Sequence, residues 1–205
     1  MTQKTVVIGV TGGIAAYKAL DVISSLKKEN VNVHVIMTSN AAKFVSPLSF
    51  QTLSQNFVIT DMFAEPRTIE VEHISLAKKA DLFAVIPATA NIIGKVACGI
   101  ADDMLTTTIM ATKSPVLFAP AMNTNMYNNP IVKENSLKLK KIGYDFIEPD
   151  SGRLACGDIG IGKLADTNKI TDIINMYLYS PKDFLGKNVL VTAGPTREDI
   201  DPVRF

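Results

Sequence analysis

The sequence predicts an α/β protein in which helices cover both faces of an open parallel sheet. A β-branched run at residues 5–10 (TVVIGV) ends in a glycine-rich turn, and residues 14–28 then carry apolar side chains at helical spacing. A second strand pattern follows at residues 31–37 (VNVHVIM), where apolar residues alternate with others. Strand, helix and strand in such short order are typical of parallel strands joined by a crossover helix.

The same order continues along the chain and extends the predicted sheet. Residues 82–86 (LFAVI) and 116–119 (VLFA) are apolar runs typical of buried strands, and each precedes a loop and a helix-like segment. An amphipathic helix is expected to close the domain at residues 170–179. These elements together indicate a Rossmann-like (flavodoxin-like) fold.

The last residues predict the beginning of a second domain. We expect one domain over residues 1–179 and a linker over residues 180–186, which opens with the turn-forming sequence SPKD. A new strand pattern (KNVLVT) begins at Lys187, and the turn AGPT follows it. Residues 187–205 are therefore expected to be the start of a domain that is cut off at Phe205.

The composition narrows the classes of protein that fit. The 205 residues are 47% hydrophobic, which suits one large core and argues against disorder. The 21 basic and 20 acidic residues give a net charge of +1 without a basic stripe, so nucleic acid is not expected as a partner. Cys98 and Cys156 lack the spacing of a zinc site, and no metal is expected. The apolar runs are strand-length and no signal-peptide pattern opens the chain, which predicts a soluble cytoplasmic protein.

Three loops are expected to meet at the carboxyl edge of the sheet, where ligands bind in open α/β folds. Gly12 and Gly13 follow the first strand, and they form either a tight turn or a loop whose backbone amides approach an anion. Thr38 ends the second strand, where it could bind a ligand or cap a helix. Residues 88–91 (ATAN) follow the third strand, and their small side chains would let a flat ring lie against the backbone. Together the loops could accept a phosphorylated ring cofactor.

Three further polar residues are candidates for chemistry, and each has a plainer alternative. His73 opens a helix-like stretch (HISLAKKAD), where a histidine is commonly a cap or a surface residue. Asn123 lies between methionines in PAMNTNM, a loop that could be only a structural turn. Cys156 lies in a glycine-rich loop (SGRLACGD), which suits a functional thiol better than the helix-like surroundings of Cys98 do.

Six segments, taken in order, resemble the flavin-containing cysteine decarboxylases, a family of homo-oligomeric enzymes. They run over the whole chain: GVTGGIAAYKA, FVSPLSFQTLS, HISLAKKADL, PATANIIGKVACGIADD, PAMNTNMYNNP and SGRLACGDIGIGKLAD. The family motif PxMNxxMW ends here in Tyr127, an aromatic replacement that we expect to be tolerated. The final segment (VLVTAGPTREDIDPVRF) resembles the start of the ligase domain that bacterial members carry, so this chain is expected to lack ligase activity.

The resemblance implies FMN as the cofactor. It implies that the flavin is bound by residues of the three loops and their neighbours, namely Gly12, Gly13, Ile14, Thr38, Phe44, Ala88, Thr89, Ala90 and Asn91. It also implies a homo-oligomer, a trimer that can assemble to a dodecamer, with the flavin near a protomer boundary. No membrane partner is expected.

The implied reaction is the FMN-dependent decarboxylation of 4'-phospho-N-pantothenoylcysteine to 4'-phosphopantetheine in coenzyme A synthesis. FMN would oxidise the thiol to a thioaldehyde, carbon dioxide would leave, and the reduced flavin would reduce the enethiol. His73 would serve as the base or orienter, Asn123 would hold the substrate carboxylate and amide, and Cys156 would protonate the enethiol. Met126 would line the pantothenoyl arm, and Lys78 would bind an anionic group of the substrate.

Two alternatives stay open. One is another flavoprotein of the superfamily, either a peptidyl-cysteine decarboxylase or a flavin prenyltransferase, although the prenyltransferases lack the ACGD loop. The other is a non-catalytic flavin-binding regulatory subunit, which would be expected to have lost His73 or Cys156. Both residues are present, and their presence favours the decarboxylase.

Overall fold

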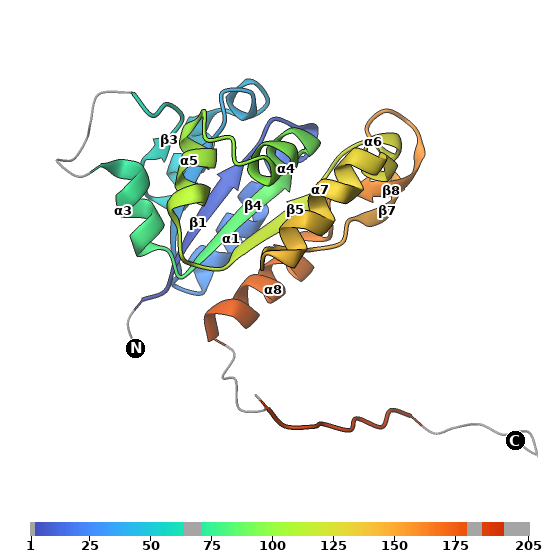
Figure 1. Ribbon diagram of the computed structural model, residues 1–205. Coiled ribbons are helices and arrows are strands. Elements are labelled where there is room, and N and C mark those ends of the chain that lie inside the picture. Colours follow the sequence, from blue (N-terminus) through green and yellow to red (C-terminus); the bar gives the residue numbers. More distant parts are fainter. Residues whose placement is uncertain (1–2, 64–70, 180–185, 195–205) are drawn as a thin grey trace, which may run out of the picture.

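The computed structural model describes residues 3–63, 71–179 and 186–194. Its centre is a parallel sheet of six strands in the order β3-β2-β1-β4-β5-β6 (Figure 1). The order reverses between β1 and β4, so a ligand is expected at the carboxyl ends of these two strands. The predicted Rossmann-like (flavodoxin-like) class is confirmed. The strands are β1 (Thr5–Val10), β2 (Asn32–Met37), β3 (Val58–Ile59), β4 (Leu82–Ala88), β5 (Val116–Pro120) and β6 (Asp145–Phe146).

Helices cover both faces of the sheet (Figure 1). One layer holds η1 (Ile14–Lys18), α1 (Ala19–Lys28), α2 (Pro47–Ser54) and α8 (Thr167–Tyr179). The other layer holds α3 (Glu72–Lys79), α4 (Ala90–Ala97), α5 (Met104–Ala111) and α7 (Pro130–Lys141). Two short elements, η2 (Ala41–Lys43) and α6 (Thr124–Asn128), follow the carboxyl ends of β2 and β5. None of the described helices has the length and apolar character needed to cross a membrane.

Successive residues of β1 belong to opposite cores. Val6 and Ile8 pack in the core beneath α1 and α8, whereas Val7 packs in the core beneath α4 and α5. All three side chains are fully buried. A strand that is buried on both faces has a continuous apolar sequence, and this explains why TVVIGV predicts a strand without alternation.

Several observed elements differ from the predicted ones. The helix expected at residues 14–28 begins as a 3-10 helix and becomes an α-helix at Ala19. The two-residue strands β3 and β6 were not predicted. The glycine-rich segment around Cys156 is not a simple loop, because it lies at the tip of an antiparallel hairpin of β7 (Asp150–Arg153) and β8 (Ile159–Lys163).

The strand expected at Lys187 is not formed in the described part of the tail. Residues 186–194 form neither helix nor strand, and Val189, Leu190 and Val191 are exposed. A strand needs a neighbour for its backbone hydrogen bonds, and among the described residues this segment pairs with none. The remainder of the expected linker and of the expected second domain, residues 180–185 and 195–205, lies outside the described residues.

Candidate functional site

A cavity of about 660 Å³ opens at the carboxyl ends of β1 and β4. Ligand and cofactor pockets in proteins typically measure about 300–1,000 Å³, so this volume suits a bound molecule. Three cations, Lys18, Arg153 and Lys163, contribute to its wall. The rest of the wall is mostly small or apolar. It comes from the loop after β1 and from η1, from the start of α4, from α6 and the loop before it, and from the hairpin and the residue after it: Gly12, Gly13, Ile14, Ala15, Tyr17, Thr89, Ala90, Ala121, Met122, Asn123, Met126, Leu154, Ala155, Cys156, Gly162 and Leu164.

The loops after β1 and β4 are joined by the side chain of Thr11. Its hydroxyl donates to the carbonyl of Pro87 (2.7 Å) and accepts from the backbone N–H of Thr89 (3.2 Å). The hydroxyl of Thr89 in turn accepts from the N–H of Ile92 (3.4 Å) and caps α4. Because Thr11 is buried, these bonds are shielded from water and the two loops form one fixed wall.

The two glycines of the first loop serve different purposes. A Cβ atom at Gly12 would lie 2.5 Å from Cβ of Asn40, in the loop after β2, so only glycine fits this approach. A Cβ atom at Gly13 would meet nothing nearer than Cγ2 of Thr89, at 3.6 Å. Gly13 therefore leaves open space beside the cavity, where a bound group could approach the backbone.

Not every residue expected to bind flavin lines the cavity. Ala88 is buried at the end of β4, and Asn91 is exposed on α4. The hydroxyl of Thr38 accepts from the N–H of Ala41 (3.2 Å), and Phe44 is exposed. Contact with FMN stays a prediction for these four residues and for the five that follow. Five of the expected residues do line the cavity: Gly12, Gly13, Ile14, Thr89 and Ala90.

Asn123 uses both ends of its side-chain amide. Its carbonyl oxygen accepts from the N–H of Asn125 (2.8 Å) and caps α6. Its nitrogen, Nδ2, donates to Sγ of Cys156 (3.4 Å) and to Oδ2 of Asp158 (3.2 Å). The cap thus determines which end of the amide faces the hairpin.

Cys156 and Asp158 lie in the turn at the tip of the hairpin. The backbone N–H of Leu154 donates to the carbonyl of Asp158 (2.8 Å), and the N–H of Gly157 donates to the carbonyl of Leu154 (2.9 Å). Within this turn the thiol of Cys156 donates to Oδ2 of Asp158 (3.3 Å). The sequence reasoning missed Asp158, although its place two residues after the cysteine in ACGD was a usable signal.

Glycines in β8 allow the hairpin to pack directly on α6 and the loop before it. A Cβ atom at Gly160 would lie 2.4 Å from Oγ1 of Thr124, and one at Gly162 would lie 2.3 Å from the carbonyl oxygen of Met122. Gly162 also has a φ of +130°, which side chains other than glycine rarely adopt. Its carbonyl accepts from the N–H of Met122 (2.9 Å) and ties the base of the hairpin to the Asn123 loop.

A single chain brings together only part of the expected site. Asn123, Met126 and Cys156 line the same cavity. His73 and Lys78 lie instead on α3, which packs against α5 at the end of the molecule opposite the hairpin (Figure 1). His73 is half-buried there and Lys78 is exposed. Within one chain, neither residue lines the cavity.

The aromatic residue that departs from the family motif has a charged partner. The hydroxyl of Tyr127 donates to Oε2 of Glu148 (2.6 Å), and Nζ of Lys140 lies 2.7 Å from Oε1 of the same carboxylate. Burial, followed by the bond to Glu148, raises the pKa of Tyr127. The hydrogen bonds from Lys140 and then from Tyr127 lower the pKa of Glu148. This chain of contacts joins α6 to α7 behind Asn123.

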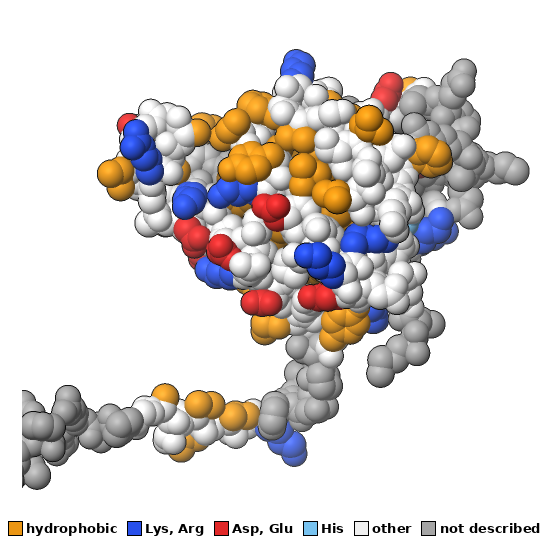
Figure 2. Space-filling view, turned by 180° about the vertical axis from the view of Figure 1, so that it is seen from behind, with side chains coloured by type: hydrophobic (Ala, Val, Ile, Leu, Met, Phe, Trp, Pro, Cys, Tyr) orange, Lys and Arg blue, Asp and Glu red, His pale blue; other side chains and the backbone are white. Residues whose placement is uncertain are grey.

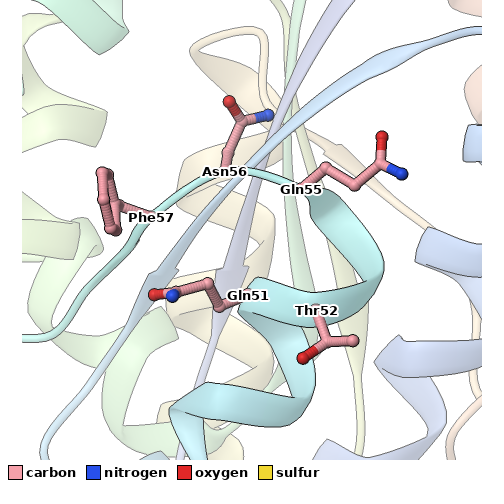
Figure 3. Close-up of a pocket in the computed structure, with 5 residues that line it drawn as sticks. All are labelled: Gln51, Thr52, Gln55, Asn56 and Phe57. Carbon is pink, nitrogen blue, oxygen red and sulfur yellow. The ribbon is translucent and has the colours of Figure 1, made fainter.

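A second hollow, of about 450 Å³, lies where α2 leads into β3. Figure 3 shows that its side chains point in different directions instead of converging on one point. None of them is ionisable: Gln51, Thr52, Gln55, Asn56 and Phe57 line it. The amide of Asn56 is engaged by the carbonyl of Val33 (2.8 Å), which is a structural bond. We assign no chemistry to this hollow.

Two family profiles and several relatives match the chain. The profile described as Flavoprotein matches residues 1–179, and that of the DNA/pantothenate metabolism flavoprotein C-terminal domain matches residues 184–205. The coenzyme A biosynthesis bifunctional protein CoaBC of Bacillus subtilis is 50% identical over 207 residues, covering 100% of this chain and 51% of that protein. The protein of the same name from Borreliella burgdorferi is 51% identical, covering 99% and 52%. The chain spans about half the length of these curated relatives.

Solved structures repeat the same fold. A mutant PPC decarboxylase complexed with pantothenoylaminoethenethiol superposes with a TM-score of 0.78 at 31% identity, covering 86% of this chain and 98% of that one. The FMN binding protein AtHal3 superposes with a TM-score of 0.75 at 32% identity, covering 85% and 96%.

Proposed function

The chain belongs to the flavoprotein family, and on this premise we propose that it binds FMN and decarboxylates 4'-phospho-N-pantothenoylcysteine to 4'-phosphopantetheine in coenzyme A synthesis. The observation that carries the proposal is the cluster of Asn123 and Cys156, 3.4 Å apart, in a cavity that also contains Gly13. The names of the matching proteins support it, because they include coenzyme A biosynthesis, PPC decarboxylase and FMN binding.

The residues of the cavity fit a flavin. The open space at Gly13 and the small side chain of Ala90 leave room for a flat ring against the backbone, and the volume of about 660 Å³ is sufficient for ring and substrate arm. Lys18 supplies a positive charge for an anionic group. When bound, FMN supplies the oxidation of the substrate thiol to a thioaldehyde and returns the two electrons to the enethiol after carbon dioxide has left.

Asn123 binds the substrate carboxylate in this proposal. Because its carbonyl oxygen caps α6, its Nδ2 group is held toward the hairpin, where it can donate to a carboxylate oxygen. A hydrogen bond to a charged acceptor is stronger than one between neutral groups. The second lone pair of the carbonyl oxygen remains for the amide N–H of the substrate. Both ends of the amide then orient the cysteinyl group.

Cys156 supplies a proton. Reduction of the enethiol places a hydride on one carbon of the double bond and a proton on the other. The thiol of Cys156 gives this proton, and the thiolate left behind takes up another from water, which the exposed position of the residue allows. Met126 lies in the same wall, 48% exposed, and provides an adaptable apolar contact for the pantothenoyl arm.

His73 acts from a neighbouring protomer in the same proposal. It would be the base or orienter of the first steps, and Lys78 on the same helix would bind an anionic group of the substrate. The chain would accordingly work as a homo-oligomer in the cytoplasm, a trimer that can assemble to a dodecamer.

Figure 2 shows apolar side chains gathered on the rear face among charges of both signs. Exposed apolar residues of η1, η2 and α2, and of the residues that adjoin them, support a contact surface: Ile14, Tyr17, Phe44 and Leu48.

The proposal is tested on the purified chain by its visible spectrum and by mass spectrometry of the product. We expect a yellow protein that releases carbon dioxide from 4'-phospho-N-pantothenoylcysteine. A colourless protein that gains no activity with added FMN, or a flavoprotein that leaves this substrate intact, would contradict it.

The shared site is tested by mixing two variants, neither of which is expected to complete the reaction. His73→Asn and Cys156→Ser each lack one group, but in a mixed oligomer some cavities would combine an intact His73 with an intact Cys156. We expect complete turnover to reappear when differently tagged variants are expressed together and purified through both tags. Mixed oligomers that do not complete the turnover would place both residues in the same chain's site.

A further inference from the structure

Asp158 accepts a hydrogen bond from Asn123, the residue that is proposed to bind the substrate carboxylate. Its Oδ2 atom lies 3.2 Å from Nδ2 of Asn123 and 3.3 Å from Sγ of Cys156. A carboxylate only accepts hydrogen bonds, so the amide and the thiol both donate to it. Asn123 therefore already binds a carboxylate, and that carboxylate belongs to the protein.

The carboxylates of Asp158 and of the substrate cannot both bind the amide of Asn123 without an electrostatic cost. They carry the same charge, and each must give up water to reach Nδ2 of Asn123. Asp158 is exposed at the hairpin tip, where water can solvate its carboxylate when it leaves the amide. A substrate carboxylate that enters the cavity would thus compete directly with Asp158.

The hairpin allows such an exchange without being released as a whole. Its base is tied to the Asn123 loop by the backbone bond from Met122 to Gly162. At the tip, the contacts to Asn123 are side-chain hydrogen bonds of Cys156 and Asp158. The bond from Leu154 to the carbonyl of Asp158 encloses both residues in one turn, so the thiol and the carboxylate would move together.

We propose that Asp158 is a positioning residue that exchanges places with the substrate carboxylate on Asn123. The inference rests on the proposed function. While the substrate keeps its carboxylate, Asp158 is displaced and the tip stands away from Asn123. Once carbon dioxide has left, Asn123 is free, Asp158 returns to it, and the same movement brings the Cys156 thiol to the enethiol. The proton donor would thus arrive only after decarboxylation.

The test compares the chain with Asp158→Asn, which keeps the size of the side chain and removes its charge. The probe is 4'-phospho-N-pantothenoylserine, which carries the substrate carboxylate but has no thiol to oxidise. Its affinity is measured by calorimetry on the flavin-loaded oligomer. We expect tighter binding, by roughly tenfold if Asp158 occupies Asn123 for nine-tenths of the time in the free protein. With the true substrate, a product two hydrogens short should accumulate.

Two controls separate competition from other effects. The product, 4'-phosphopantetheine, has no carboxylate at this position, so Asp158→Asn should not tighten its binding. Asp172→Asn makes the same charge change at an exposed position on α8 and should leave the affinity for both molecules unchanged.

The inference depends on whether Asp158→Asn strengthens or weakens the binding of the serine compound. If Asp158 only stabilised the turn, its replacement would weaken binding of the serine compound or leave it unchanged, and either result would overturn the exchange. Failure of the unmodified chain to release carbon dioxide would instead overturn the proposed function. The serine titration needs no turnover, so it still decides the exchange in that case.

Discussion

The cavity has two walls of opposite construction. The wall formed by the β1 and β4 loops is fixed by Thr11 of the β1 loop, whose buried hydroxyl bonds to the backbone of Pro87 and Thr89 at the end of β4. The hairpin wall presents Cys156 and Asp158, which are exposed and reach Asn123 through side-chain hydrogen bonds of 3.2–3.4 Å. The hydrogen bonds of the first wall are buried and hold it in one arrangement, whereas the exposed side chains of the second wall can exchange hydrogen-bond partners.

This difference matches the two tasks of the proposed reaction. A cofactor that serves an oxidation and a later reduction must keep one position through both steps. A substrate must enter, lose a group, accept a proton and leave. Changes in the fixed wall should therefore remove the flavin and all activity together, while changes at the hairpin and α6 should keep the flavin and interrupt single steps.

The largest effect is expected at Gly12. Gly12→Ala would place a Cβ atom 2.5 Å from that of Asn40, and overpacking of this kind costs about 1–3 kcal/mol of stability. We expect loss of flavin, loss of activity and a lower Tm, measured by absorbance after gel filtration and by thermal unfolding. Gly13→Ala is the matched control for stability, because its Cβ atom makes only an ordinary contact and the Tm should hold. A Gly12→Ala protein with a full complement of flavin would contradict the claim that the fixed wall holds the cofactor.

The second prediction concerns His73, which lies in neither wall of its own chain. His73→Asn should keep its flavin, because α3 contributes nothing to the cavity lining of that chain. Decarboxylation should be lost, since the base or orienter would be missing from the neighbouring site. The measurement is the rate of carbon dioxide release at equal flavin content. Near-normal rates would return His73 to the role of a helix-terminal residue.

At Asn123 the expected effect is on substrate binding. Asn123→Asp still caps α6 but turns a donor into a second carboxylate that faces the substrate's own. Loss of one hydrogen bond to a charged group costs about 1.5–3 kcal/mol, or about ten- to a hundredfold in binding. The variant should keep FMN, bind substrate poorly and turn over almost none of it. Substrate titration of the flavin spectrum measures this, and equal affinities would leave Asn123 as a cap alone.

Cys156→Ser should interrupt only the last step. Oxidation and loss of carbon dioxide do not need the thiol in the proposed mechanism, so the enethiol should accumulate. Mass spectrometry should find a product two hydrogens lighter than 4'-phosphopantetheine. Complete turnover by this variant would remove Cys156 from the mechanism and, with it, the reason for a movable hairpin.

The fixed wall was the easier of the two to predict from sequence. Its strands are long apolar runs, and the carboxyl ends of neighbouring parallel strands must meet at one edge, so Gly13 and Thr89 were expected together and do line one cavity. Phe44 and Asn91 were expected there as well, but within one chain they face solvent. The sequence predicts which loops lie at the edge of the sheet, but it does not predict which of their side chains point into the cavity.

The hairpin wall was harder to predict because its glycines obscure the sequence pattern of a strand. In β8 (IGIGK) every second position is a glycine, and Gly160 and Gly162 allow close packing against Thr124 and Met122. That packing is visible only in three dimensions, and so is the contact of Asp158 with Asn123. The distance of His73 from the cavity was equally beyond the sequence, because it depends on the order of strands in the sheet.

The smallest effect is expected at Tyr127, which supports the α6 side of the hairpin wall from behind. Tyr127→Phe removes a bond to Glu148, and because that carboxylate is exposed the cost should be only about 0.5–1 kcal/mol of unfolding free energy. The bonds of Lys140 and Tyr127 lower the pKa of Glu148, so their stabilisation is complete above the ordinary pKa of a glutamate and is lost as the pH falls through the lowered value. The difference in Tm between the two proteins should therefore be constant near neutral pH and shrink in acid. A difference that stays the same in acid would show that Tyr127 acts through packing and not through this carboxylate.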